Sequence, residues 1–291
     1  MRTKLLACAA IFGLFSTLTV AAVPNAVVDA VQAPAWVERA ERRLPLRPGM
    51  QLENRDRLLT GSGARVVVQL ADGSAVKLGE NASVAVNAMQ QEKKGFFSGA
   101  IDVAKGAFRL TTDIFRKLQS QRTINVRAGT VTIGIRGTDI WGRSNDEKDF
   151  VCLLEGHVVA SHPLGEPVQL TEPLQFYGAD KGQAPGPVAM VDKAQLEKWA
   201  QETELQDGGG TQQASGRWLL SFGHLDKDGA LALHDQLAAA GYAGQISPIR
   251  VSGGYLYEFR LRQLVTEREA KSLADKLVRT LDVPAPSIRR Y

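Results

Sequence analysis

The stretch WLLSFG at residues 218–223, followed by YLYEFRL at residues 255–261, decides the fold of the last quarter of the chain. In both, apolar residues alternate with other residues, which is typical of a strand with one buried face. A helical pattern of apolar residues follows each strand, first at Ala230, Leu233, Leu237 and Ala238 and then at Ala270, Leu273, Ala274, Leu277, Val278 and Leu281. Two strand–helix units in tandem predict a small sheet with both helices on one face.

The starts of both predicted helices carry capping signals. Thr266-Glu-Arg-Glu269 has the spacing of a capping box, in which the side chains at both ends accept hydrogen bonds from backbone N–H groups. Asp226 or Asp228 is expected to cap the first helix.

The order of elements in residues 217–291 resembles the SPOR (sporulation-related repeat) family. The residues that carry the resemblance are Trp218–Gly223, Ala230, Leu233, Leu237, Gly241, Tyr257–Leu261 and Glu269–Ala270. The resemblance implies an α+β domain with a ferredoxin-like βαββαβ order, in which two helices back a four-stranded sheet. It also implies binding of peptidoglycan, with a preference for glycan strands that lack stem peptides and are concentrated at division sites.

The outward face of that sheet is the predicted glycan-binding surface. Strand alternation turns the neighbours of the helix-facing residues outward, and the candidates are Leu219, Ser221, Arg250, Glu258, Arg260 and Arg262. Arginine can bond a carboxylate bidentately, and serine can exchange hydrogen bonds with sugar hydroxyls. The alternative is that these side chains are only the solvated face of a small sheet.

Three of these positions depart from the family pattern. Ser221 stands where glutamine is frequent, Glu258 where arginine is common, and Arg262 where a glycine is usual. The departures leave two interpretations open, weakened glycan binding or a surface turned to another partner.

Residues 49–162 predict β structure. Short apolar runs alternate at Val66–Leu70, at Val76–Leu78 and at Val84–Val86. Asp72-Gly73-Ser74 between the first two runs predicts a three-residue loop, with Val68 opposite Leu78 and Gly73 or Ser74 at positive φ. Further along, the expected elements are a hairpin arm with Phe96, Phe97, Ile101 and Val103, another strand at 106–110, and a short helix within 111–121.

A change of phase at Gly137 predicts a bulge or a tight bend. Val131, Ile133 and Ile135 occupy odd positions, whereas the next apolar residue after Gly137 is Ile140. Gly137 is expected to serve backbone geometry. The structural motif comprises Arg136, Gly137, Thr138 and Asp139, with an ion pair or turn hydrogen bond expected from the two charged residues.

The segment Gly129–Trp141 resembles the FecR family. So do Gly61–Arg65, Leu70–Ser74, Gly106–Arg109 and Leu154–Val158, in the same order along the chain. The resemblance implies a mainly-β periplasmic domain. The founding member relays a signal to a cytoplasmic sigma factor through a long N-terminal region, whereas here an apolar segment begins at residue 5. We therefore expect a scaffold or a sensor and interaction module.

The remaining segments complete a multidomain organisation. Residues 1–22 predict a signal peptide, with a basic start and an apolar run, and residues 23–48 a lead-in with a short helix or turn at 35–44. The connecting segment 163–216 is expected to hold a helix at about 188–205, followed by a flexible glycine-rich linker from residue 206 that separates the two domains. With Cys8 in the signal peptide, Cys152 is the only remaining thiol and no internal disulfide is expected.

Composition and motifs exclude several functional classes. A formal net charge of +4, which loss of Arg2 and Lys4 would lower by two, is too weak to argue for nucleic acid. No nucleophile elbow, phosphate loop or metal motif occurs, and the odd spacing of Cys152, His157 and His162 would turn them to opposite faces of a strand. Neither a cofactor nor a metal is expected.

The predicted protein is therefore an exported, non-enzymatic envelope protein without a stable membrane span after signal cleavage. Its expected place is the periplasm, in association with the cell wall and its septal region. Its expected partners are peptidoglycan glycan strands and envelope or divisome proteins. One alternative is a protein–protein adaptor whose sheet has lost glycan binding. Another is a glycan-cleaving enzyme, which would need a pair of carboxylates in a cleft.

Overall fold

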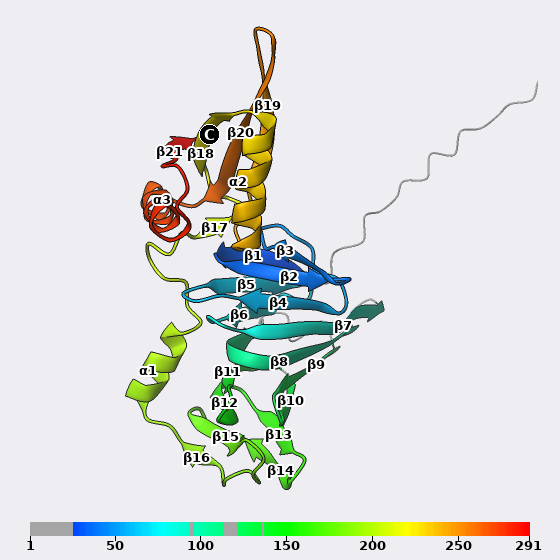
Figure 1. The fold of residues 1–291 in the computed structure, drawn as a ribbon. Helices are drawn as coiled ribbons and strands as arrows, with labels where there is room; N and C mark the ends of the chain where they lie inside the picture. The colour runs from blue at the N-terminus through cyan, green and yellow to red at the C-terminus, as the bar shows by residue number, and fades with distance from the viewer. Residues whose placement is uncertain (1–25, 94–95, 113–120, 136) are drawn as a thin grey trace, which may run out of the picture.

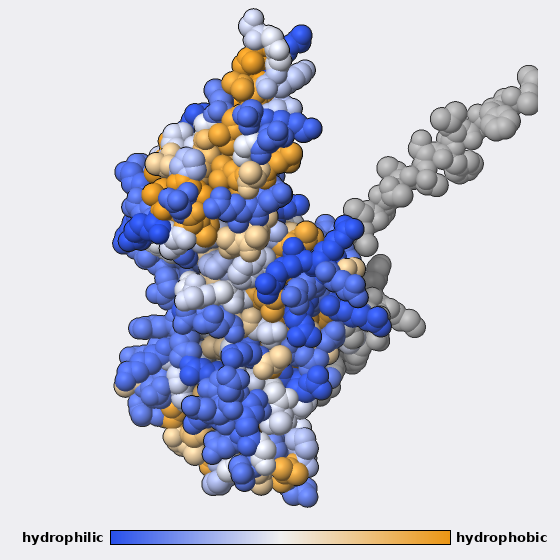
Figure 2. Space-filling model, in the orientation of Figure 1, coloured by the Kyte–Doolittle hydropathy of each residue, from blue (hydrophilic) through white to orange (hydrophobic). Residues whose placement is uncertain are grey.

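The computed structural model describes residues 26–93, 96–112, 121–135 and 137–291. Strands are stacked along the long axis of an elongated molecule, with two helices covering the strands at one end (Figure 1). On the face shown in Figure 2, apolar side chains gather over those helices and the neighbouring hairpin, whereas hydrophilic side chains dominate the stacked strands.

Residues 26–190 form two facing sheets with one core between them. Sheet A contains, in spatial order, β1 (Ala26–Gln32), β5 (Arg65–Leu70), β6 (Ala75–Leu78), β8 (Phe96–Thr111), β11 (Asp139–Ser144), β12 (Lys148–Glu155), β15 (Gln175–Asp180) and β16 (Ala189–Met190). Sheet B contains β3 (Arg42–Pro45), β2 (Ala35–Arg39), β4 (Asp56–Thr60), β7 (Ser83–Lys93), β8 again, β9 (Gln121–Ala128), β10 (Val131–Ile135), β13 (Val158–His162) and β14 (Gly165–Leu170).

Strand β8 belongs to both sheets and bends at Gly106. Its first part pairs with β7 and β9 in sheet B, and its last part pairs with β6 and β11 in sheet A. Gly106 has φ +100°, and a Cβ atom there would lie 2.5 Å from the Cα atom of Ala82, so only glycine fits this corner. The predicted hairpin arm and the predicted strand at 106–110 are therefore one bent strand, and the predicted helix within 111–121 falls mostly outside the described residues.

The phase change at Gly137 is a crossing from one sheet to the other. Strand β10 lies in sheet B and β11 in sheet A, and Gly137 between them has φ +80°. Ile135 and Ile140 are both buried in the core from opposite sheets. The tight bend, and not a bulge within one strand, is the correct interpretation.

Three local predictions need correction. Residues 35–44 form the β2–β3 hairpin, with no helix. Four residues, Ala71–Ser74, separate β5 and β6 where a three-residue loop was predicted; Gly73 has φ +90°, as predicted, but Val68 pairs with Val76 and not with Leu78. The helix expected at 188–205 is the shorter α1 (Lys193–Gln201).

The C-terminal unit has the element order β18 (Trp218–Leu225), α2 (Lys227–Ala239), β19 (Gln245–Val251), β20 (Gly254–Leu264), α3 (Glu267–Leu281) and β21 (Ser287–Arg290). The strands lie in the order β19-β20-β18-β21 and are all antiparallel, and both helices cover one face of them (Figure 1). The Asp226 side chain accepts a hydrogen bond from the Gly229 N–H and caps α2, while Thr266 caps α3.

The prediction of a flexible linker is wrong, because the glycine-rich segment forms contacts with both the β unit and the C-terminal unit. Strand β17 (Gln212–Gln213) pairs with β1 and with the end of β20, so sheet A continues into the C-terminal sheet. The buried carboxylate of Glu269 accepts hydrogen bonds from the N–H groups of Gly208, Gly210 and Thr211 at 2.7, 2.6 and 2.8 Å. Glu269 thus fixes this segment, whereas the capping box had placed its side chain on the start of α3.

Direct contacts also join the two units. The Ala35 N–H donates to the Gly241 carbonyl at 3.2 Å, and the Lys276 ammonium donates to the Ala33 carbonyl at 3.0 Å. Among the described residues, no helix combines the length and the apolar character needed to cross a membrane.

Candidate functional site

The predicted glycan-binding residues lie on the outer face of sheet A, with one exception. Glu258, Arg260 and Arg262 share the face of β20 that points away from the helices, because Phe259 and Leu261 between them are buried in the core. Arg250 pairs with Tyr255 near the tip of the β19–β20 hairpin. Tyr255 and Phe259 are an even number of positions apart on β20, so both point to the face that the helices cover. Arg250 lies on that face too, opposite to Glu258, Arg260 and Arg262. The expectation that Arg250 joins this surface is therefore wrong.

Glu258 is the centre of the surface, although it is only 1% exposed. Its carboxylate accepts hydrogen bonds from the Ser221 hydroxyl and from Arg260, whose Nε lies at 2.7 Å, and it forms an ion pair with Arg289 at 3.3 Å. Burial opposes the ionisation of Glu258, but the hydrogen bonds from Arg260 and Ser221 and the charges of Arg260 and Arg289 outweigh it and lower its pKa. Glu258 is thus an ionised anchor that holds two arginines.

Ser221 and Leu219 point outward but are buried as well. The Ser221 hydroxyl is engaged by Glu258, so it supports the network beneath the surface. Of the six predicted residues, the structure brings five together on one face, and only Arg260 and Arg262 keep substantial contact with solvent.

Sequence reasoning missed Arg289 and Tyr291, which complete this surface. Arg289 has a side chain that is 54% exposed and pairs with Leu219 across β18 and β21. The Arg262 guanidinium lies 4.4 Å from the centre of the Tyr291 ring, a cation–π geometry. The sequence signal that could have identified Arg289 and Tyr291 is the alternation of Ser287, Arg289 and Tyr291 after the last helix, which places them on one face of a strand.

The arginines exceed the carboxylates on this surface. Arg260 and Arg289 form ion pairs with Glu258, whereas Arg262 has no ion-pair partner among the described residues and its Nε has no hydrogen-bond partner. We call these three arginines with Tyr291 the arginine face. The arrangement suits a ligand that carries carboxylates or other hydrogen-bond acceptors.

Over residues 65–155, the outer face of sheet A is covered by another segment of the chain. Residues 191–206, here called the strap, run across it and include α1. Trp199 of the strap stacks on Trp141 with ring centroids 5.1 Å apart and planes 3° apart, and Phe150 packs beside them. A Cβ atom on Gly79 would lie 2.7 Å from the Glu202 carbonyl oxygen, so the strap backbone presses directly on the sheet.

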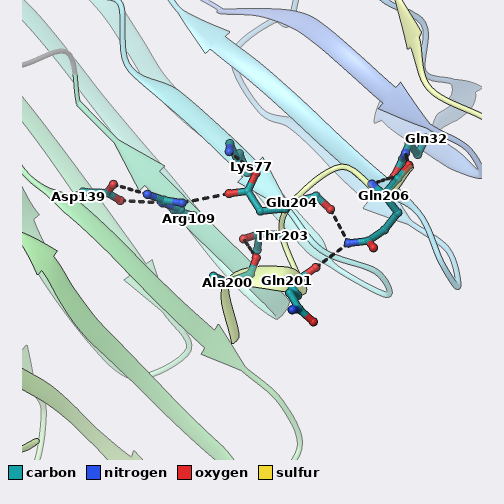
Figure 3. A network of polar contacts seen from close by, with 9 residues as sticks. All are labelled: Gln32, Lys77, Arg109, Asp139, Ala200, Gln201, Thr203, Glu204 and Gln206. Atoms are coloured by element: carbon teal, nitrogen blue, oxygen red, sulfur yellow. Dashed lines mark hydrogen bonds and ion pairs between the residues drawn. The ribbon is translucent and has the colours of Figure 1, made fainter. Parts of the chain in front are cut away.

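Asp139 takes part in the polar contacts that hold the strap (Figure 3). It binds Arg109 bidentately at 3.0 and 2.7 Å, and Arg109 also contacts Glu204 of the strap at 3.0 Å. Glu204 reaches Lys77 as well, at 2.5 Å. The hydrogen bonds that Arg109 donates to Asp139 and Glu204, and the negative charges of these two carboxylates, raise the pKa of Arg109 against the effect of burial.

The motif around Gly137 is therefore built differently from the prediction. Asp139 pairs with Arg109 from β8, and Arg136 lies outside the described residues. Thr138 is buried, and its N–H donates to the Thr112 hydroxyl at 2.6 Å. The described residues of the motif hold the bend and link it to sheet A.

Within the described ranges, no three His, Cys, Asp or Glu side chains gather in a way that could hold a metal ion. Cys152 is buried in β12 as a free thiol, and burial raises its pKa to about 12. His157 is exposed, and the buried His162 accepts the Leu164 N–H through Nδ1 at 3.1 Å.

Comparisons with known proteins support part of the sequence interpretation. Residues 56–159 match the model of a family described as FecR protein, which confirms the predicted resemblance for this part of the chain. No curated protein matches the chain.

Two crystal structures of a "putative anti-sigma factor" from Parabacteroides distasonis are similar at low identity. The first is 15% identical and covers 78% of this chain and 91% of its own, and the second is 14% identical and covers 81% and 99%. Both have a TM-score of 0.40, too low to support an argument about fold or function.

Proposed function

We propose that the chain is an exported, non-enzymatic envelope protein that binds peptidoglycan glycan strands through the arginine face. The observation that carries the proposal is the charge imbalance of this face, where Arg260 and Arg289 share the carboxylate of Glu258 and Arg262 has no ion-pair partner among the described residues. Glycan strands without stem peptides expose lactyl carboxylates, which guanidinium groups can bind bidentately.

The roles within the face differ. Glu258 and Ser221 are buried and orient Arg260 and Arg289, so they position the surface without contacting the ligand. Arg262, Arg289 and Tyr291 are the proposed contacts, because their side chains reach solvent. The βαββαβ order of residues 218–290 supports a SPOR-like unit, and repeated sites along a glycan strand would add avidity to a modest single-site affinity.

The FecR-related β unit is the proposed scaffold or interaction module. Strand β17, Glu269 and the Ala35–Gly241 hydrogen bond join it to the C-terminal unit. Wall binding would therefore place the β unit in a defined orientation at the periplasmic face of the wall, with septal enrichment where stripped glycan is concentrated.

A pull-down of the full chain with purified peptidoglycan, before and after amidase removal of stem peptides, tests the proposal. We expect stronger retention on the stripped glycan, lost in the double variant Arg262→Ala/Arg289→Ala. The matched control is Arg42→Ala/Arg57→Ala, which removes two exposed arginines from the β unit and should be retained like the parent protein.

Failure of the parent protein to bind either material would overturn the proposal. The adaptor alternative would then lead, with the arginine face turned to an acidic protein surface. Retention of the Arg262→Ala/Arg289→Ala variant at the parent level would leave wall binding intact but move it to another surface.

A further inference from the structure

A polar cleft of about 480 Å³ opens where β8 changes from one sheet to the other. Its walls come from the start of β5, the turn after β6, the bend of β8, the end of β11 and the residue that follows α1. Three cationic side chains line it, Arg65, Lys105 and Arg143, together with the carboxylates of Glu80 and Glu202. The cleft lies in the β unit, apart from the arginine face.

Arg65 is an unusual residue in this cleft, because it is a buried guanidinium without a partner carboxylate. It is 9% exposed, and its Nη1 donates to the Ala64 carbonyl at 2.8 Å. Its Nε is buried without any hydrogen-bond partner. Burial lowers the pKa of Arg65, and the charge of Glu80 offsets this only in part.

The carboxylates of the cleft are committed to other groups. Glu80 accepts the Gly63 N–H at 2.6 Å, and Glu202 forms an ion pair with Arg143. Neither lies within 4.0 Å of the Arg65 guanidinium. A buried cation without an ion-pair partner is strongly unfavourable, and the more distant charge of Glu80 offsets this only in part, so this site favours an anion from solution.

The other groups around the cleft can complete such a site. Lys105 is half-exposed, and its partner Asp146 is largely exposed, so this ion pair exchanges readily with water. Asn145 uses its Oδ1 to accept the N–H groups of Glu147 and Lys148, which leaves its amide NH₂ as a donor.

We propose that this cleft binds a small oxyanion, a carboxylate or a phosphate group, between Arg65, Lys105 and Arg143. Beyond the bond to the Ala64 carbonyl, the Arg65 guanidinium keeps N–H donors that no protein acceptor uses in the described structure, and guanidinium groups bind both carboxylates and phosphates. A bound anion would compete with Glu202 for Arg143, at the point where the strap leaves α1.

Titration calorimetry on the full chain, with inorganic phosphate and with acetate at constant ionic strength, tests the proposal and separates the two anion classes. We expect one site for at least one probe, with binding weakened about tenfold or more in Arg65→Gln. Arg127→Gln, which removes an exposed arginine paired with Asp102 on sheet B, is the matched control and should stay within about twofold of the parent.

Circular dichroism establishes that Arg65→Gln is folded. If it is not, Asn145→Asp supplies the second test, since a negative charge at the rim should repel the anion and weaken binding to a similar extent. The absence of binding of both probes to the parent protein would overturn the proposal, as would unchanged affinity in the folded variants. Arg262→Ala/Arg289→Ala should leave the phosphate or acetate affinity unchanged, so this result is independent of wall binding.

Discussion

The two halves of the outer face of sheet A differ in how their cations are neutralised. Over the β unit, Lys77, Arg109 and Arg143 are matched by Asp139, Glu202 and Glu204, and the strap covers them. Over the C-terminal unit, the arginine face is open, and Glu258 is its one ion-pair partner in the part of the chain that the structure describes. One continuous sheet thus carries a closed half and an open half.

The difference indicates which half is available for a ligand. Under the strap, Lys77 and Arg109 are neutralised by Glu204 and Asp139, so a ligand could reach them only by displacing the strap; the cleft at Arg65 is the exception in this half. Charges in the open half exceed their internal partners, since Glu258 pairs with Arg260 and Arg289 but no described carboxylate pairs with Arg262. Positive charge left uncompensated on an exposed surface is the feature that we associate with binding.

The largest expected effect concerns Glu258. Glu258→Gln should lower the free energy of unfolding by about 3 kcal/mol, because it removes the buried negative charge that holds Arg260 and Arg289. Chemical denaturation measures this change. Ser287→Ala, an exposed position on the same face, is the control and should change stability by less than about 0.5 kcal/mol.

A smaller effect is expected from the aromatic contact of the strap. Trp199→Ala should cost about 2 kcal/mol, because Trp199 is half-buried against Trp141 and Phe150. The exposed aromatic rings of the sheet should then bind a hydrophobic dye such as ANS. Unchanged stability and dye binding would mean that the strap does not close this half of the sheet.

Glu204 should matter less than Glu258, although each contacts two cations. Glu204→Ala should lower stability by about 1 kcal/mol, because the Glu204 side chain is partly exposed and water solvates Lys77 and Arg109 after its loss. A loss equal to that of Glu258→Gln would contradict the distinction between a solvated and a buried carboxylate.

The smallest expected effect is a pH dependence shared by both units. The pKa of Glu258 is lowered in the folded state, so its contribution to stability is present above its ordinary pKa of 4.5 and is lost as the pH falls through the folded value. The stability difference between the parent protein and Glu258→Gln should therefore narrow on acidification below about pH 4.5.

Asp149 in the β unit should behave in the same way. Burial opposes its ionisation, but hydrogen bonds from Lys181, Ser144 and Thr130 outweigh this and lower its pKa. Asp149→Asn should thus also converge with the parent protein in acid. A gap that widens on acidification in either variant would show that the sign of the pKa shift is wrong.

The sequence predicted what depends on local periodicity. Strands β18 and β20 and helix α3 form where these local patterns predict them, with Ala270, Leu273, Ala274 and Leu277 buried, although Val278 of the predicted stripe is exposed. The positive φ of Gly73 and the bend at Gly137 likewise follow from the residue itself.

The parts that could not be predicted depend on contacts between distant residues. Glu204 meets Arg109 across 95 positions, and Glu269 meets Gly208 across 61, so no local pattern reports either contact. A glycine-rich composition suggested freedom for residues 206–216, but a buried carboxylate at the start of α3 fixes them. Ser221 and Glu258 lie at strand positions that face outward, and the sequence therefore predicted them to be exposed. They are buried because the arginine side chains cover them.

The most direct test of the open arginine face is the dissociation constant for soluble glycan strands without stem peptides. It should be measured for the full chain, for Arg262→Ala/Arg289→Ala and for the control Arg42→Ala/Arg57→Ala. Loss of two charge-assisted contacts should weaken binding by about a hundredfold in the first variant, while the control stays close to the parent protein. Equal weakening in both variants, or no measurable binding by the parent protein, would contradict the assignment of this face.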